Sequence, residues 1–419
     1  MAKANRILIV GAGPAGLAMA RALSGHGLDI HVFERASSES LASPADDGRE
    51  IALTHRSERL LRELGHWERL KTEEIGQLRE AVVLDGDARD GLRFQSPGGK
   101  SEAGPLGWLV PNAALRRVAF DAVKDEGDVT LHTDAVVTDV DTEANGVTLT
   151  LADGWRFDGN LLLAADTRFS FTRRACGIAA DHHDFGKVML VGRVRHDEPH
   201  HGTAWEWFRY GQTLALLPLH QAHTASVVIT VAPAEARALQ ALPQESLGEV
   251  LAQRFDQRLG AMTALGPLHA YPLVGVYPKR LVSERMALVG DAAVGMHPVT
   301  AHGYNFGLLG VATLSEALKA AQRQGRPLHD PRLLADYERR HRRATRPLYV
   351  ATRLVAGLYT DDRLPARALR KAAVVVAGRL PGFATAIVKG LRDEGRGASP
   401  RWPITRRLIG GLLSNLNRG

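Results

Sequence analysis

A glycine-rich turn near the start of the chain constrains its fold more than any other feature. An apolar, strand-like run leads into Gly11-x-Gly13-x-x-Gly16, a helical stretch follows, and a second strand ends at Glu34. In such a turn the first glycine permits the bend, the second lets a pyrophosphate approach the backbone, and the third allows close helix–strand packing. The unit predicts a parallel βαβ fold that binds a dinucleotide, with phosphates at the helix N-terminus and Glu34 on a ribose.

Composition places the chain among ordinary folded proteins. Its 419 residues are 45% hydrophobic and 24% charged, which is enough to bury two or three domain-sized cores. The single cysteine, Cys176, excludes an intrachain disulfide and favours a reducing, cytoplasmic setting. The N-terminus leaves no room for a secretory signal before the first strand. No stretch is both long and apolar enough for a membrane-spanning helix.

The positive charge is concentrated at the C-terminal end. Residues 331–419 contain 19 Lys and Arg but only 6 Asp and Glu, although the net charge of the whole chain is +7. This pattern indicates either a solvated surface on C-terminal helices or attraction to an anionic membrane. Arg406 and Arg407 lie among apolar residues, as in a basic helix that rests on a bilayer. Nucleic acid is not expected, because one cysteine excludes zinc fingers and no stretch resembles an RNA-stacking strand.

The remaining periodicity alternates between strands and helices. Strand-like runs occur at 129–137, 146–151 and 161–165, and strands are favoured from 186 to 232. Helix-like spacing of apolar residues occurs at 56–70 and 112–124 and again after 300. We expect Pro327, Pro347, Pro365 and Pro381 to break the C-terminal helices. Segments 36–50 and 85–105 are rich in turn-forming residues and are expected to be loops.

Two later motifs also place an acid at the end of an apolar strand. The first is Asp166, after the run 161–165, and it is followed by Ser170 and Arg173. The second is Asp291, which follows Gly290 and leads into the stretch HPVTAHGYNFGL at 297–308.

In this order, the three motifs resemble those of the class A flavoprotein aromatic hydroxylases, the family of para-hydroxybenzoate hydroxylase. Segments 47–67 and 202–219 look like those of the ubiquinone-biosynthesis branch, and HPVTAHGYNFGL looks closest to its UbiM type. The resemblance covers about residues 5–350.

The resemblance implies an α/β fold in which a Rossmann-like FAD-binding domain is interleaved with a β-sheet substrate domain, plus C-terminal helices. The implied FAD-binding segments are 1–75, 106–178 and 273–330. The implied substrate-domain segments are 76–105 and 179–272, and 331–419 would form a basic helical region.

The implied activity is that of an FAD-dependent, NAD(P)H-linked monooxygenase. It would use O₂, through a flavin C4a-hydroperoxide, to hydroxylate a polyprenylated phenol or quinol intermediate of ubiquinone biosynthesis. A small soluble aromatic substrate is the alternative. A halogenase or reductase on the same fold, or a scaffold that holds FAD only structurally, also remains open. The basic region 331–419 would contact the inner membrane or a ubiquinone-biosynthesis complex.

The resemblance also implies site residues. Pro298, His297 and His302 would lie at the reacting end of the flavin. The expected cofactor-binding residues are Gly11, Gly13, Ala15, Gly16, Glu34, Arg35, Arg49, Asn112, Asp166, Asp291, Gly303 and Asn305. No metal is expected, since the pairs His182-His183 and His200-His201 lack further ligands at metal-binding spacing.

Two departures from the family pattern complicate this assignment, and one is His302, which stands where the ubiquinone branch commonly has Gln. Ala164 and Thr167 replace glycines that the family usually has around Asp166, and a Cβ at Thr167 makes a positive φ costly. This substitution weighs against NAD(P)H binding by the usual route. On the predicted strand that carries Trp205 and Trp207, we expect one ring to face the substrate and the other to face core or solvent.

Overall fold

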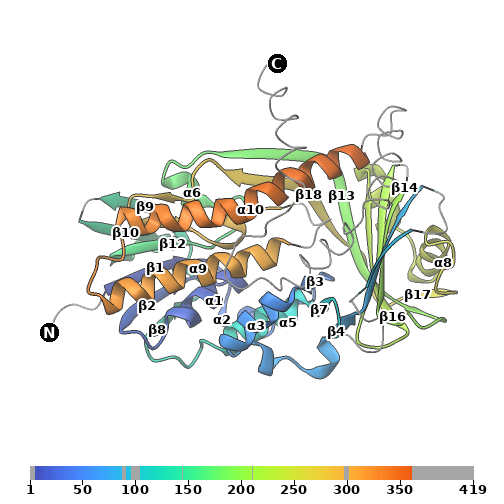
Figure 1. Ribbon diagram of the computed structural model, residues 1–419, viewed down its shortest axis with the longest axis horizontal. Helices are drawn as coiled ribbons and strands as arrows, with labels where there is room; N and C mark the ends of the chain where they lie inside the picture. Colours follow the sequence, from blue (N-terminus) through green and yellow to red (C-terminus); the bar gives the residue numbers. More distant parts are fainter. Residues whose placement is uncertain are drawn as a thin grey trace, which may run out of the picture.

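The computed structural model describes residues 5–86, 91–95, 104–143, 145–209, 211–296 and 302–360. Two large sheets dominate it, with long helices beside one sheet, short helices at the outer side of the other, and a smaller sheet between the two (Figure 1). His297, Pro298 and the basic segment 361–419 lie outside the described residues.

The first large sheet has six strands built around β1 (Asn5–Val10), which pairs in parallel with β2 and β12. The strand order is β19-β20-β12-β1-β2-β8, and only β19 is antiparallel to its neighbour. The other strands are β2 (Leu28–Phe33), β8 (Val129–His132), β12 (Leu161–Ala164), β19 (Val282–Ser283) and β20 (Met286–Leu288). Ile7, Leu8 and Ile9 are fully buried, because both faces of a parallel sheet are covered.

Helices cover one face of this sheet and a three-stranded sheet covers the other (Figure 1). The helices are α1 (Pro14–Leu23), α5 (Asn112–Asp121) and α9 (Gly303–Arg323). The strands are β9 (Val137–Glu143), β10 (Gly146–Leu151) and β11 (Arg156–Gly159). A Cβ at Gly159 would lie 2.6 Å from the Leu8 side chain, so the two layers meet closely there.

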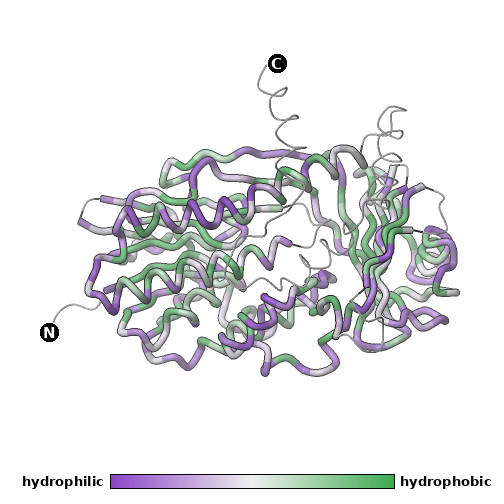
Figure 2. The backbone as a smooth tube through the Cα atoms, in the orientation of Figure 1, coloured by the Kyte–Doolittle hydropathy of each residue, from purple (hydrophilic) through white to green (hydrophobic). Residues whose placement is uncertain are grey.

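The second large sheet has eight strands. The order is β17-β13-β16-β15-β14-β5-β6, and β18 also pairs with β13. Its long strand is β13 (Ala180–His196), and α7 (Pro233–Gln240) and α8 (Gln244–Arg254) pack on one face. The other strands are β5 (Glu80–Asp85), β6 (Leu92–Gln95), β14 (Thr203–Arg209), β15 (Gln212–Pro218), β16 (Thr224–Val231), β17 (Met262–Ala264) and β18 (His269–Pro278). Figure 2 shows hydrophobic residues concentrated on the strands and hydrophilic residues along much of the outer helices.

A small sheet, β3-β7-β4, lies between the two large ones (Figure 1). Its strands are β3 (Glu50–Leu53), β4 (Gly76–Leu78) and β7 (Gly107–Pro111). The remaining short elements are α2 (Ser38–Ala42), α3 (His55–Glu63), α6 (Phe171–Ala175), η1 (Trp67–Arg69), η2 (Thr72–Glu74) and η3 (Gly290–Ala292).

Four local predictions were wrong. Segment 36–50 contains α2, because the Ser37 hydroxyl caps its first turn by accepting from the Ser40 N–H, and 85–105 contains β6, which pairs with β5. The predicted helix 56–70 ends early, since Gly65 adopts a positive φ of 68°. Pro347 does not break α10 (Pro331–Thr360), because Tyr337 and Tyr349 anchor the helix in the core on both sides of it.

Candidate active site

The glycines of the first turn meet the steric demands expected of them. Gly11 has a φ of 105°, and a Cβ there would lie 2.6 Å from the Ala165 carbonyl oxygen. A Cβ at Gly16 would lie 1.9 Å from the Gly11 oxygen. At Gly13, by contrast, a Cβ would have no described atom within 4 Å, so the backbone is open to a ligand there. Among the described residues, no side chain caps the N-terminus of α1 beside this opening.

Glu34 closes the second strand and organises the loop beneath the turn. Its carboxylate accepts hydrogen bonds from the Ala12 N–H at 2.8 Å and the Ala36 N–H at 3.0 Å. The neighbouring Arg35 is exposed. The acid thus lies beside the glycine turn, as the sequence motif predicts.

Asp166 lies at the end of β12, directly against Gly11. One carboxylate oxygen accepts from the Thr172 N–H at 3.2 Å, and the other is buried without a partner among the described residues. Thr167 is not strained, since its φ is not positive, and its hydroxyl accepts from the Phe169 N–H. The loop has therefore adapted to the Cβ that replaces the usual glycine.

Asp291 brings the two later motifs together. Its carboxylate forms an ion pair with Arg168 at 3.0 Å, and Arg168 also donates to the Val274 carbonyl at 3.1 Å. Gly290, with a φ of 62°, lies so close to Ala15 that a Cβ there would come within 2.6 Å of the Ala15 Cβ. Residues more than 100 positions apart in sequence thus surround one end of the six-stranded sheet.

A polar cluster lies on the loop that precedes β3. The Asp47 carboxylate accepts from Arg49 at 2.6 Å and from the Asn112 amide at 2.8 Å. The Arg49 guanidinium lies 5.2 Å from the ring centroid of Tyr271, whose hydroxyl donates to the Asp47 carbonyl. Burial by itself raises the pKa of Asp47, but the hydrogen bonds from Arg49 and Asn112 outweigh it and lower that pKa.

The same loop is tied to the eight-stranded sheet. Arg193 on β13 pairs with Glu50 at 2.8 Å and with Asp46 at 2.8 Å. The Glu50 side chain is 1% exposed. Burial raises its pKa to about 7, against the attraction of Arg193. These pairs fix the 46–50 loop across the junction of the two large sheets.

The start of α9 is fastened to β3 and α3 through Asn305. Its amide oxygen accepts from the Thr54 N–H at 3.1 Å and the Ser57 hydroxyl at 2.6 Å, and its amide nitrogen donates to the Ala52 carbonyl at 2.8 Å. Gly303 begins the helix with open space at its Cβ position. His302 occupies the N-cap position, and its ring lies 5.7 Å from that of Phe306.

These residues fit an FAD molecule. The open backbone at Gly13 beside the N-terminus of α1 suits a pyrophosphate. The acid at the end of β2 suits ribose hydroxyls. The buried oxygen of Asp166, unpartnered within the described chain, is an acceptor that a ligand donor can satisfy.

Comparison with known proteins supports the same family. A family model described as "FAD binding domain" matches residues 5–350. The ubiquinone hydroxylase UbiM of Neisseria meningitidis is 41% identical over 92% of this chain and 84% of its own length. The chain belongs to the ubiquinone hydroxylase family of FAD-dependent monooxygenases. The ubiquinone hydroxylase UbiL of Rhodospirillum rubrum is 34% identical over 90% of the present chain and 87% of UbiL's own length.

Solved structures share the fold of this hydroxylase. PqsL of Pseudomonas aeruginosa, described as a probable FAD-dependent monooxygenase, aligns with a TM-score of 0.74 at 21% identity over 89% of this chain and 100% of its own. Klebsiella pneumoniae HpxO, solved with FAD and uric acid, aligns with a TM-score of 0.70 at 23% identity over 93% and 96%. The predicted family and fold class are thereby confirmed.

The tryptophan prediction for the hydroxylase was wrong. Trp205 and Trp207 are two positions apart on β14, so both lie on the face covered by α7 and α8. Glu206, between them, lies on the opposite face. Side chains alternate between the two faces at successive positions of a strand, so residues two positions apart share a face, whereas the prediction had placed Trp205 and Trp207 on opposite faces.

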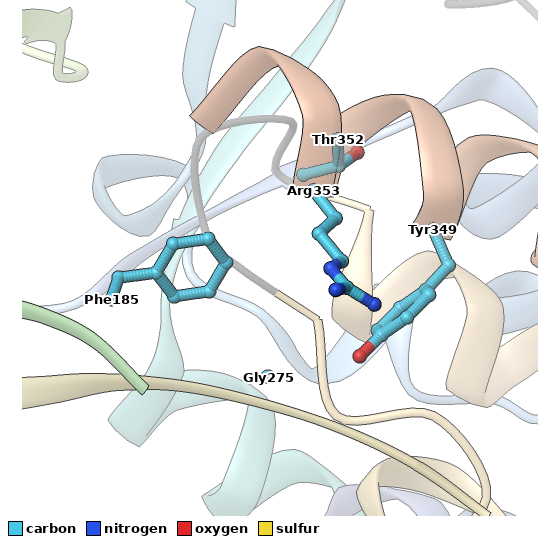
Figure 3. A pocket seen from close by; sticks show the side chains of 5 residues that line it. All are labelled: Phe185, Gly275, Tyr349, Thr352 and Arg353. Carbon is cyan, nitrogen blue, oxygen red and sulfur yellow. The ribbon is translucent and has the colours of Figure 1, made fainter. Parts of the chain in front are cut away.

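Two pockets in the described part of the chain are lined by none of the proposed cofactor-binding residues. One, of about 470 Å³, is bordered by α1, α3 and α9. The other holds only about 10 Å³ beneath α10, and its lining comprises Phe185, Gly275, Tyr349, Thr352 and Arg353 (Figure 3). In Figure 3, Tyr349 and Arg353 extend from α10 above Gly275. This second pocket has room for little more than one water molecule.

Several residues of the site were not identified from the sequence. They share one property, which is that each pairs with a residue far away in the chain: Asp47, Glu50, Arg168, Arg193 and Tyr271. Local signals existed for three of them, since Arg168 directly follows the Asp166-Thr167 pair, and Asp47 and Glu50 lie beside Arg49 in the 47–67 segment.

Proposed function

We propose that this protein binds FAD, takes reducing equivalents from NADH or NADPH, and hydroxylates the aromatic ring of a polyprenylated phenol or quinol intermediate of ubiquinone biosynthesis. Bound FAD supplies the redox chemistry that activates O₂. The observation that carries the proposal is the Arg168–Asp291 pair, which joins the two later motifs beside the glycine turn. The names of the relatives support the substrate class.

In this proposal the protein's own residues divide the binding of FAD between them. Gly11, Gly13, Ala15 and Gly16 receive the pyrophosphate with the N-terminus of α1. Ribose contacts come from Glu34, with Arg35 beside it at the loop surface, and Asp166 lies along the pyrophosphate. Asp291 binds the ribityl chain, and Arg49 and Asn112, oriented by Asp47, line the approach to the ring system.

At the reacting end, Gly303 offers backbone to the flavin, and Asn305 holds the first turn of α9 in place through its inward hydrogen bonds. His302 remains a candidate for a hydrogen bond at this end. His297 and Pro298 keep their proposed place beside the flavin on sequence grounds alone. The Arg193 pairs close the 46–50 loop over the substrate side and exclude water.

We also propose a cytoplasmic protein that docks reversibly on the inner membrane through the basic C-terminal region. Within residues 5–360, as far as they are described, no helix combines the length and apolarity needed to cross a bilayer. Flotation with anionic vesicles of the full chain and of a chain lacking 400–419 tests the docking. Equal flotation of the two chains would refute membrane docking through residues 400–419.

The hydroxylase proposal is tested with the purified full chain. We expect flavin absorbance bands, and NADH or NADPH oxidation that a prenylated phenol stimulates more than a small aromatic acid does. Mass spectrometry should find one added oxygen in the phenol. A protein that stays colourless after FAD is added back would refute the proposal, whereas equal turnover of small aromatics would favour a soluble substrate.

A further inference from the structure

Glu206 is a carboxylic acid on the inner face of the eight-stranded sheet. Its neighbours Trp205 and Trp207 pack into the core beneath α7 and α8. In register with Trp207, the residues of adjoining strands, Leu84, Leu214, Ile229 and Leu190, are all buried in the same core. Because successive side chains of a strand point to opposite faces, Glu206 points away from this core.

The register also identifies what shares the face of Glu206. The row across the sheet runs through Val83, Glu206, Ala215, Val228 and Val191. The row is otherwise apolar, and its far end is covered by the 46–50 loop, since a Cβ at Gly48 would lie 3.2 Å from the Val191 side chain.

The contacts of Tyr271 identify the part of the molecule toward which the Glu206 face of the sheet is turned. It pairs with Met189 on β13, two positions from Val191 and therefore on the same face. Its hydroxyl donates to Asp47, and its ring lies under Arg49. Glu206 is thus on the face of the sheet that is turned toward the proposed flavin-binding loop.

Glu206 lacks the partners that a buried acid normally has. It is half-buried, and no described residue forms a hydrogen bond or ion pair with its carboxylate. Glu80 on the adjacent strand β5 provides the contrast, because its buried carboxylate accepts from Arg93, Gln95 and Thr203. Because Glu206 is only half-buried and its carboxylate oxygens retain accessible surface, a donor on a ligand can reach the carboxylate and supply the partner that the described residues do not.

The acidity of Glu206 is also suited to a phenol. Burial alone raises its pKa to about 8. A phenol ordinarily has a pKa of about 10. Above about pH 8, Glu206 is ionised while the phenol still holds its proton, and a hydrogen bond from a hydroxyl to an ionised carboxylate is among the stronger ones.

We propose that the Glu206 carboxylate receives the hydrogen bond of the substrate's phenolic hydroxyl and so selects phenols over otherwise identical aromatic ethers. This inference rests on the proposed function, since it assumes that the ring to be oxidised lies against the inner face of the sheet. Drawing the hydroxyl proton toward the carboxylate raises the electron density of the ring, which favours attack by an electrophilic oxygen. The apolar row beside Glu206 contacts the remainder of the ring.

The test measures binding of a short-chain prenylated phenol and of its methyl ether to the FAD-loaded full chain, by flavin difference spectra. At about pH 9, where Glu206 is ionised, we expect the wild type to prefer the phenol on the order of tenfold, as suits a hydrogen bond to a charged group. Glu206→Leu should lower the preference to about twofold or less, and Glu206→Gln should give an intermediate value. Glu80→Gln, in the adjacent strand, should keep the wild-type preference.

Thermal stability gives a second readout. Loss of an acid that stabilises the fold would lower the melting temperature. Because the Glu206 carboxylate has no partner among the described residues, Glu206→Leu should keep the wild-type melting temperature or raise it. An undiminished preference in Glu206→Leu, or a stability loss in that variant, would overturn the inference while the hydroxylase proposal stands. If the wild type neither binds nor oxidises any phenol, the proposed function fails as well.

Discussion

Replacement of Asn305 by alanine separates a structural clamp from a flavin contact. The change removes three hydrogen bonds, to the Thr54 N–H, the Ser57 hydroxyl and the Ala52 carbonyl, at a residue that is 8% exposed. At about 1 kcal/mol for each bond, the free energy of unfolding should fall by about 3 kcal/mol. We expect this loss in the FAD-free protein as well as the loaded one, because all three partners are protein groups.

Urea unfolding followed by circular dichroism measures this effect in both forms. Ser57→Ala is the comparison variant, since it removes one of the three Asn305 bonds together with the bond that the Ser57 hydroxyl accepts from the Thr54 hydroxyl, and it should cost about 2 kcal/mol. If Asn305→Ala destabilises only the loaded protein, its amide acts on the flavin, and our placement of it as a clamp is incorrect. A change below about 0.5 kcal/mol in both forms would refute the hydrogen-bond reasoning itself.

Three further predictions concern the turn, the loop and a helix cap. Gly16→Ala should abolish FAD retention by forcing α1 away from Gly11, whereas Gly13→Ala should fold normally and only weaken FAD binding, as flavin fluorescence titration can determine. Because Glu50 has a raised pKa of about 7 in the folded protein, it binds more protons there than when unfolded, so stability should fall by roughly 3 kcal/mol from pH 4.5 to pH 7. Glu50→Gln should remove that component of the pH profile, and an unchanged profile would contradict it. Ser170→Ala should cost about 1 kcal/mol in thermal melts, since the Ser170 hydroxyl caps α6 by accepting the N–H three residues on.

The part of the fold that could be predicted was local. The β1–α1–β2 unit follows from steric demands within some twenty residues: an apolar strand, a glycine that tolerates positive φ, and a helix that must pack against its own preceding turn. The acid motifs at Asp166 and Asp291 were found for the same reason, because each closes a continuous apolar strand. Where local signals conflicted with packing, as at Pro347, the prediction was wrong.

The sequence by itself therefore determined the nucleotide-binding unit, the family and the identity of most proposed cofactor residues. Only the tertiary structure decided that Arg168 pairs with Asp291 and that Arg193 holds the 46–50 loop. It also decided that Glu206, and neither tryptophan, lies on the sheet face turned toward the proposed flavin-binding loop. The reason is physical. Turn and helix preferences act over a few neighbouring residues, but an ion pair or the face of a strand depends on which distant segments fill the adjoining space, and that is settled only when the sheets pack together.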